Sequence, residues 1–437
     1  MLTRRDFVRC GVLAGSGALA LLAGCGGRPS LGPAVRGDGD EVRSLVARAA
    51  GDRTLAHGAA AAVRAFTADL YRLLSRSDRN LVCSPYSVAV ALAMTRTGAR
   101  GRTAAEMDRV LHAPALEQLN GGLGAEDALL EKRSGTVRRA DGSTAKVELH
   151  VANSLWGQRG VAWRSPFLDA LARSYGAGMR LVDYRNPEAA RSRINAWTSD
   201  QTHGKIDELI PEDVLTALTR LVLVNALYLK APWEHPFEAS RTAPLPFIRA
   251  DGSAVDVPTM RTEIHGARYA RGGGWEAAEL RYAGNELAMT VILPDRGTGQ
   301  ALRTDLDGDQ LAEILRAPAP VGALDLRLPK WTFRTAASLN GTLAALGMPT
   351  AFDERTADFA GMTGDERLYI SEVMHQAFIA VDEAGTEAAA ATAVAVSDSS
   401  AGPLPVSMVV DRPFLFVIHD LPTATPLFIG RITDPSA

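Results

Sequence analysis

The spacing of hydrophobic residues predicts two helices at the start of the fold. Between residues 59 and 75 apolar side chains recur three or four positions apart, which is typical of an amphipathic helix with one buried face. These positions are Val63, Phe66, Leu70, Leu73 and Leu74. A second helix is predicted over residues 88–97, because Pro85 follows Ser84 at a place where the first helical turn tolerates a residue without an N–H.

Short runs rich in β-branched and apolar residues predict strands along the rest of the chain. Helical patterns fall between these runs, but helices cluster early and strands late. That order favours an α+β fold over a doubly wound parallel sheet. The predicted strands are residues 147–156, 221–229, 288–293, 323–328, 377–381, 414–419 and 427–432.

One segment near the carboxyl end has a composition suited to two conformations. From Gly385 to Val396 no side chain is larger than Thr or Val except Glu387, and there is no proline to remove a ladder donor. On a period of two, one face is uncharged and consists of Thr386, Ala388, Ala390, Thr392, Val394 and Val396. An alanine-rich surface helix is the alternative, since alanine is the best helix former. The segment lacks a periodic apolar stripe, however, and β-branched residues crowd its second half.

The stretch Glu-Ala-Gly-Thr-Glu-Ala-Ala-Ala-Ala-Thr at residues 383–392 resembles the reactive-loop hinge of the serpins. Serpins are protease inhibitors whose loop inserts as a new strand into a central sheet. The hinge residues are Glu383, Gly385, Thr386, Glu387, Ala388, Ala389, Ala390, Ala391 and Thr392. Further stretches that resemble the family are residues 80–88, 98–103, 152–156, 194–197, 202–206, 223–233, 328–330, 357–359, 411–414 and 426–430.

The resemblance runs in register over residues 59–434 and implies the serpin fold, an α+β fold with three β-sheets and about eight or nine helices. It also implies an exposed reactive loop over about 383–410. By the family's spacing from Glu383, the cleaved bond joins Ser399 to Ser400. The segment after the cut is about three residues longer than usual, so Ala401 and Val396 remain rivals.

The implied function is inhibition of a serine-type endopeptidase by loop cleavage, trapping of the acyl-enzyme and loop insertion. The small, neutral residues around the bond favour elastase- or subtilisin-like targets, and a cysteine protease is a further possible partner. A non-inhibitory serpin that acts as a carrier or chaperone is the first alternative, although such members usually have bulky or charged residues in the hinge. A cell-surface hydrolase is the second, but the chain lacks the nucleophile-elbow, zinc-protease and phosphate-loop motifs. We expect neither enzymatic activity nor a cofactor or metal.

Two further groups of residues take roles from the resemblance. Ser84, Ser87, Asn225 and His375 correspond to a polar cluster under the central sheet where it opens for the loop. An unpaired Asn225 amide inside its apolar run would cost roughly 1–3 kcal/mol, so these groups need one another. A serine with a histidine also suggests catalysis, but no oxyanion motif accompanies them. Trp233, Lys330 and Glu383 correspond to a gate at the top of that sheet, where Glu383 pairs with Lys330; an ordinary surface ion pair is the alternative.

The first residues of the chain predict an export signal, which is not part of the folded domain. Arg4 and Arg5 form a twin-arginine pattern, an apolar run too short to span a bilayer follows, and Leu-Ala-Gly-Cys at 22–25 resembles a lipoprotein cleavage box. We therefore expect a signal peptide over 1–25 and acylation of Cys25, which would anchor the exported protein to a membrane at the cell surface or in the periplasm. Residues 26–57 predict a flexible tether, and 58–437 a single domain.

Charge and cysteine content narrow the remaining classes. The formal net charge of −3 provides no footprint for nucleic acid. Once Cys10 leaves with the signal and Cys25 is acylated, Cys83 has no partner, so we expect no disulfide. We expect a monomer.

Overall fold

The computed structural model describes residues 35–37, 39–50, 52–299, 304–364, 367–387 and 405–437. The first predicted helix is α1, Arg53–Leu74. It begins earlier than the apolar stripe predicts, because the Asp52 side chain caps it by accepting a hydrogen bond from the Thr54 N–H. The second is α2, Pro85–Arg96, with Ser84 as its N-cap and proline in the first turn. The other α-helices described are α3 (Gly101–Val110), α4 (Leu116–Leu130), α5 (Ser165–Tyr175), α6 (Pro187–Gln201), α8 (Gly308–Arg316) and α9 (Asn340–Leu346).

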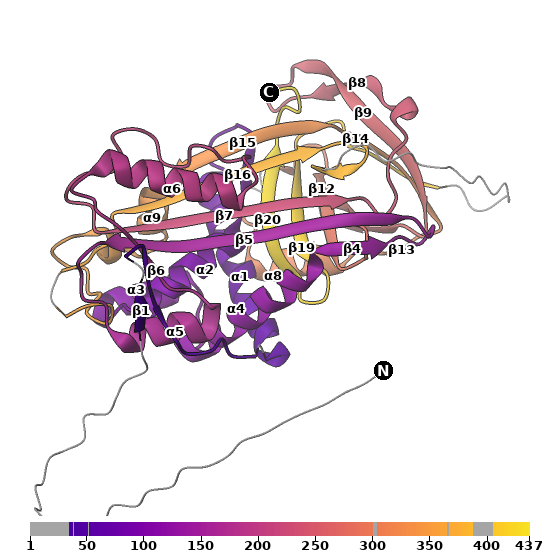
Figure 1. Cartoon of the computed structure of the whole chain (residues 1–437). Helices are drawn as coiled ribbons and strands as arrows, with labels where there is room; N and C mark the ends of the chain where they lie inside the picture. The colour runs from indigo at the N-terminus through magenta and orange to yellow at the C-terminus, as the bar shows by residue number, and fades with distance from the viewer. Residues whose placement is uncertain (1–34, 38, 51, 300–303, 365–366, 388–404) are drawn as a thin grey trace, which may run out of the picture. The chain divides into compact units, whose positions relative to one another are not determined.

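Three sheets are present (Figure 1). The large sheet has nine strands: β1 (Val35–Gly37), β2 (Glu41–Ser44), β6 (Met179–Val182), β5 (Thr144–Gln158), β7 (Leu221–Pro232), β17 (Gly385–Thr386), β16 (Glu372–Val381) and β15 (Trp331–Ser338) in this order, with β4 (Gly135–Arg138) paired to β5. The seven-stranded sheet runs β13 (Ala319–Pro320), β10 (Arg268–Gly272), β11 (Trp275–Arg281), β12 (Leu287–Pro294), β19 (Phe414–Asp420), β20 (Thr425–Ile432) and β3 (Leu81–Cys83). The four-stranded sheet runs β18 (Val406–Val409), β14 (Ala323–Pro329), β9 (Ala254–His265) and β8 (Ala243–Ile248). The expected α+β fold with three sheets is confirmed, and the described residues include eight α-helices.

The two faces of the large sheet pack against different cores. Alternate β7 residues such as Leu223 and Leu227 join the main core with α1, α2 and the seven-stranded sheet. The intervening residues, such as Val224, join a smaller core with Ile194 of α6. The period of two that predicts β7 as a strand therefore also assigns each residue to a face. This assignment decides below which hinge residues would meet which core.

The large sheet includes part of the predicted tether. Within residues 26–57, strand β2 pairs with Met179 and Arg180 of β6, and Ser44 is buried with its hydroxyl donating to Asp169 at 2.5 Å. The structure thus differs from the predicted boundary at residue 58. The physical reason is that an edge strand such as β6 offers unpaired N–H and C=O groups, which even a four-residue segment satisfies.

Two other sequence-based expectations concern single features of the described chain. Cys83 is buried, and burial raises the pKa of its thiol to about 12, so it is an inert apolar residue. Among the described residues, no helix combines the length and apolarity needed to cross a membrane.

Candidate functional site

The large sheet is open at one end between its two central strands. At one end, which we call the lower end, β7 and β16 pair directly, with residues 222–226 in parallel register with 372–376. At the other, upper end, where β7 and β16 finish, the two-residue strand β17 lies between them. Thr386 pairs with Ala231 on one side and with Val381 on the other. Gly385 and Thr386, the third and fourth residues of the predicted hinge stretch 383–392, are thus already part of the sheet.

The first hinge residues fit this gap tightly. A Cβ on Gly385 would lie 2.3 Å from the carbonyl oxygen of Ala231, so only glycine allows this approach. Thr386 is buried, and its hydroxyl lies 2.7 Å from that of Tyr282. Small side chains at this end of the segment are therefore a steric requirement.

The predicted gate residues lie at the top of the same gap. The Lys330 ammonium donates to Glu383 Oε2 at 2.7 Å, and the Thr242 hydroxyl donates to Oε1 at 2.7 Å. Burial opposes ionisation of Glu383, but these bonds outweigh it and lower the pKa of the carboxyl. Trp233 has a different task from the pair: its indole N–H donates to the Asp382 carbonyl at 3.0 Å, and its backbone N–H to the Ala384 carbonyl at 2.9 Å.

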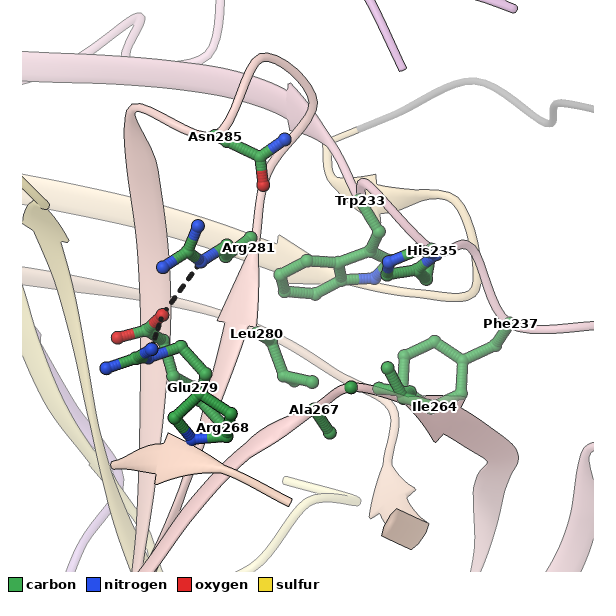
Figure 2. Close-up of a pocket in the computed structure, with 12 residues that line it drawn as sticks. Trp233, His235, Phe237, Ile264, Ala267, Arg268, Glu279, Leu280, Arg281 and Asn285 are labelled. Carbon is green, nitrogen blue, oxygen red and sulfur yellow. Dashed lines mark hydrogen bonds and ion pairs between the residues drawn. The ribbon is translucent and has the colours of Figure 1, made fainter. Parts of the chain in front are cut away.

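A cavity of about 230 Å³ adjoins the gate tryptophan (Figure 2). Trp233, Phe237 and Leu280 provide apolar walls, and the Trp233 ring stacks on Tyr282 at 4.7 Å. On the polar side, Glu279 accepts a hydrogen bond from Arg281 at 2.9 Å. Trp233 therefore lies between the hinge backbone and this cavity.

Glu387 is the last hinge residue that the structure describes. Its side chain is 5% exposed and lies 3.7 Å from the Lys205 ammonium, in the segment that follows α6. Burial raises the pKa of Glu387, although Lys205 and a hydrogen bond with Tyr228 act against the shift. The Glu387 carboxyl is thus buried, with only part of its hydrogen-bonding capacity satisfied, at the point where the chain leaves the sheet.

The predicted opening cluster is built around one histidine. His375 Nε2 accepts the Ser84 backbone N–H at 3.1 Å, so Nδ1 carries the proton and donates to Asn225 Oδ1 at 2.8 Å. Burial lowers the pKa of His375 to about 4 and keeps the ring neutral. The Ser87 hydroxyl donates instead to Asn153 of β5, at 2.5 Å. Asn153 is a member that the sequence reasoning missed, because β5 contains several other polar residues and its pattern does not single out this amide.

This cluster does not have the geometry of a catalytic site. Ser84 meets His375 through its backbone, and its hydroxyl caps α2 by accepting the Ser87 N–H at 3.3 Å. Both side chains are buried under the sheet. Within the described part of the chain, the Asn225 and Asn153 Nδ2 groups find no hydrogen-bond acceptor. A buried donor that lacks an acceptor costs roughly 1–3 kcal/mol.

The remaining predicted site residues lie outside the described residues. They are Cys25, Ala388, Ala389, Ala390, Ala391, Thr392, Val396, Ser399, Ser400 and Ala401.

Comparison with known proteins identifies this architecture. The sequence profile of the family described as Serpin (serine protease inhibitor) matches residues 61–435. The chain belongs to the serpin family. An uncharacterized serpin-like protein of Thermococcus kodakarensis is 37% identical over 379 residues, 86% of this chain and 85% of its own. A leukocyte elastase inhibitor of Xenopus tropicalis is 33% identical over 385 residues, covering 85% of this serpin and 97% of the relative.

Solved structures agree with the sequence comparison. The native-state crystal structure of the thermophilic serpin tengpin superposes with a TM-score of 0.77 at 28% identity, over 89% of this chain and 96% of tengpin. The gap between β7 and β16 is therefore a feature of a serpin's central sheet.

Proposed function

We propose that this serpin inhibits a serine-type endopeptidase by inserting its cleaved loop between β7 and β16. The observation that carries the proposal is the register of β17. Thr386 already pairs with both neighbouring strands and Gly385 with β7, antiparallel in each case, so the continuing chain has a defined path. The family is described as one of serine protease inhibitors. In this chain, residues 388–396, which follow Glu387, all have small side chains.

The path follows from counting along the strands. Each step forward from Thr386 moves one residue back along β7 and along β16. Thr392, six residues on, would lie opposite Asn225, six before Ala231, and also opposite His375, six before Val381. The two independent registers meet at the pair that now bonds directly, Asn225 with His375. Ten residues on, Val396 would reach Leu221, the first residue of β7.

Insertion would exchange one set of contacts for a larger one. Neighbouring strands lie about 4.8 Å apart, so a strand placed between β7 and β16 must break the bond between Asn225 and His375. In return, the Thr392 hydroxyl would lie beside the unsatisfied Asn225 amide. The even-numbered residues from 386 to 396 would face the main core, and each of them is uncharged. A strand from 386 to 396 is about 36 Å long at ~3.3 Å per residue.

The native form would then be kinetically trapped. The inserted form gains backbone hydrogen bonds on both sides of the new strand, whereas the loop joined at both ends cannot reach the bottom of the sheet. Cleavage releases that constraint. A protease still attached as an acyl-enzyme would be carried along by the moving segment before it is released.

The target class rests on the residues near the cut. The segment 394–401 is small and neutral apart from Asp398, which suits elastase- or subtilisin-like enzymes. The leukocyte elastase inhibitors among the relatives support the same class. We place the cleaved bond between Ser399 and Ser400.

A panel of purified proteases tests this function. The serpin, incubated with pancreatic elastase, subtilisin, trypsin and papain, should form an SDS-resistant complex with elastase or subtilisin. Mass spectrometry of the released carboxyl-terminal peptide should give Ser400 as its first residue. Cleavage of the loop by every enzyme without any covalent complex would contradict the proposal.

We further infer that Cys25 carries a lipid anchor. The basis is the twin-arginine pattern and the Leu-Ala-Gly-Cys box. In its own host the protein should fractionate with membranes, and Cys25→Ser should release it or leave it unprocessed. A wild-type protein found wholly in the medium would contradict the anchor.

A further inference from the structure

Three side chains with metal-binding atoms gather on the α6 face of the large sheet. Glu148 and His150 are two residues apart on β5, so they point to the same side, while Val147 and Leu149 are buried on the other. His203 follows the end of α6 with a φ of 50°, a left-handed conformation rare outside glycine. The ligand atoms of the three residues all lie within 4.8 Å of one another.

The donor set suits zinc. Two imidazoles and a carboxylate form a three-ligand site that leaves a fourth position for water, and imidazole is a preferred ligand of this metal. In a tetrahedral site with bonds of ~2.0–2.1 Å the donors are about 3.4 Å apart, so the side chains need to close by at most about 1.4 Å. Both histidines are exposed, which leaves them free to rotate and open to an ion from solvent.

The competing interactions at these residues are weak. Glu148 pairs with Lys146 at 3.0 Å, but the lysine side chain is 70% exposed, and such a pair contributes little. The two imidazole rings are already in contact, with centroids 5.1 Å apart.

The cluster adjoins both strands that must separate for the loop. The His203 ring packs on Tyr228 of β7 with centroids 5.1 Å apart. Two residues further on, Lys205 lies over the Phe378 ring of β16 at 5.5 Å and pairs with Glu387 of the hinge. The segment 203–205 therefore spans the line along which residues beyond Glu387 would enter the sheet.

We propose that Glu148, His150 and His203 bind a Zn²⁺ ion that fastens the segment after α6 to β5 and slows insertion of the loop. This departs from the expectation of no metal drawn from the sequence. The binding site stands on geometry alone; the effect on insertion rests on the proposed inhibitory function. If insertion requires the segment to lift and release the ion, Zn²⁺ at 100 times its Kd would slow insertion by up to about 100-fold.

Isothermal titration of the metal-free protein with ZnCl2 tests the site. One ion should bind per chain, and His203→Ala should weaken binding at least about tenfold while the circular dichroism spectrum stays unchanged. The matched control is His265→Ala. Glu263 and His265 have the same spacing on β9 and lie 3.8 Å apart, but belong to no three-residue group among the described residues. This variant should bind as the wild type does. No binding by the wild type, or equal binding by His203→Ala, would overturn the site.

Stopped-flow measurement of complex formation, with and without ZnCl2, tests the effect on insertion. The wild type should slow with zinc, and His203→Ala should not. A bound ion without any change in rate would overturn the regulatory part and leave the site in place. If the metal-free protein forms no SDS-resistant complex with any protease, the proposed function fails, while calorimetry still decides the zinc site.

Discussion

Replacing Thr392 by arginine should convert this serpin from an inhibitor into a substrate. In the structure β7 and β16 pair directly at Asn225 and His375. After cleavage the register would bring residue 392 to that position. The change therefore acts on the inserted form and on the path toward it.

The magnitude follows from the surroundings of that position. Asn225 and His375 are 0% and 1% exposed. Their surroundings disfavour a positive charge, since burial lowers the pKa of His375 to about 4. An uncompensated buried charge costs about 3–5 kcal/mol. If most of this cost is felt as the strand passes that point, insertion slows by roughly 10²–10⁴-fold, because each 1.36 kcal/mol is a factor of ten. Hydrolysis of the acyl-enzyme then overtakes insertion.

The assay is the stoichiometry of inhibition together with the fraction of protease in SDS-resistant complex. Thr392→Arg should be cleaved at the wild-type rate but yield almost no complex. Thr392→Val is the matched control, because it has nearly the same shape without the charge, and it should keep most of its inhibitory capacity. Full inhibition by the arginine variant would refute the register, and with it insertion to this depth.

Two further predictions concern the cluster and the gate. The pKa of His375 is about 4 when folded against 6.5 when unfolded, so its contribution to stability is complete above pH 6.5 and is lost as the pH falls toward 4. In urea titrations the wild type should therefore lose up to about 3 kcal/mol more than His375→Gln across that window, and parallel pH profiles would contradict the assignment. Lys330→Ala removes a partly exposed ion pair with Glu383, so it should change the free energy of unfolding by less than about 1 kcal/mol. Lys330→Ala should nevertheless hasten the spontaneous loss of inhibitory activity, measured over days. The control Arg185→Ala breaks the exposed pair with Asp183 and should not hasten this loss. Equal rates of loss in the two variants would contradict the gate role of Lys330.

Much of the fold was predictable because periodicity is a local property. The helical stripe of α1 and the alternation along β7 are both recorded in consecutive residues, and each element forms where its pattern lies. Strand β2 was missed because four residues carry too little pattern, and its pairing is decided by the free edge of β6. The placement of Gly385 and Thr386 could not be predicted either, since a sequence suited to both a loop and a strand does not say where the change occurs.

The site was predictable only as far as the resemblance extended. It named Lys330 and Glu383, which lie 2.7 Å apart. Pattern alone could not add Asn153, whose partner Ser87 lies 66 residues away. Nor could it bring His203 to His150, because that contact depends on how α6 crosses the sheet. Contacts of this kind arise from tertiary packing and leave no periodic trace.

Calorimetry of intact and loop-cleaved protein tests insertion most directly. In an ordinary domain a nicked loop is neutral or harmful, because the cut adds chain freedom without new contacts. Here a strand of about a dozen residues would gain hydrogen bonds on both sides at roughly 0.5–1.5 kcal/mol each, a sum comparable with the stability of a whole domain. The midpoint of thermal unfolding should therefore rise by tens of degrees after cleavage. An unchanged or lower midpoint would mean that the segment after Thr386 does not enter the sheet, and the inhibitory mechanism would fall with it.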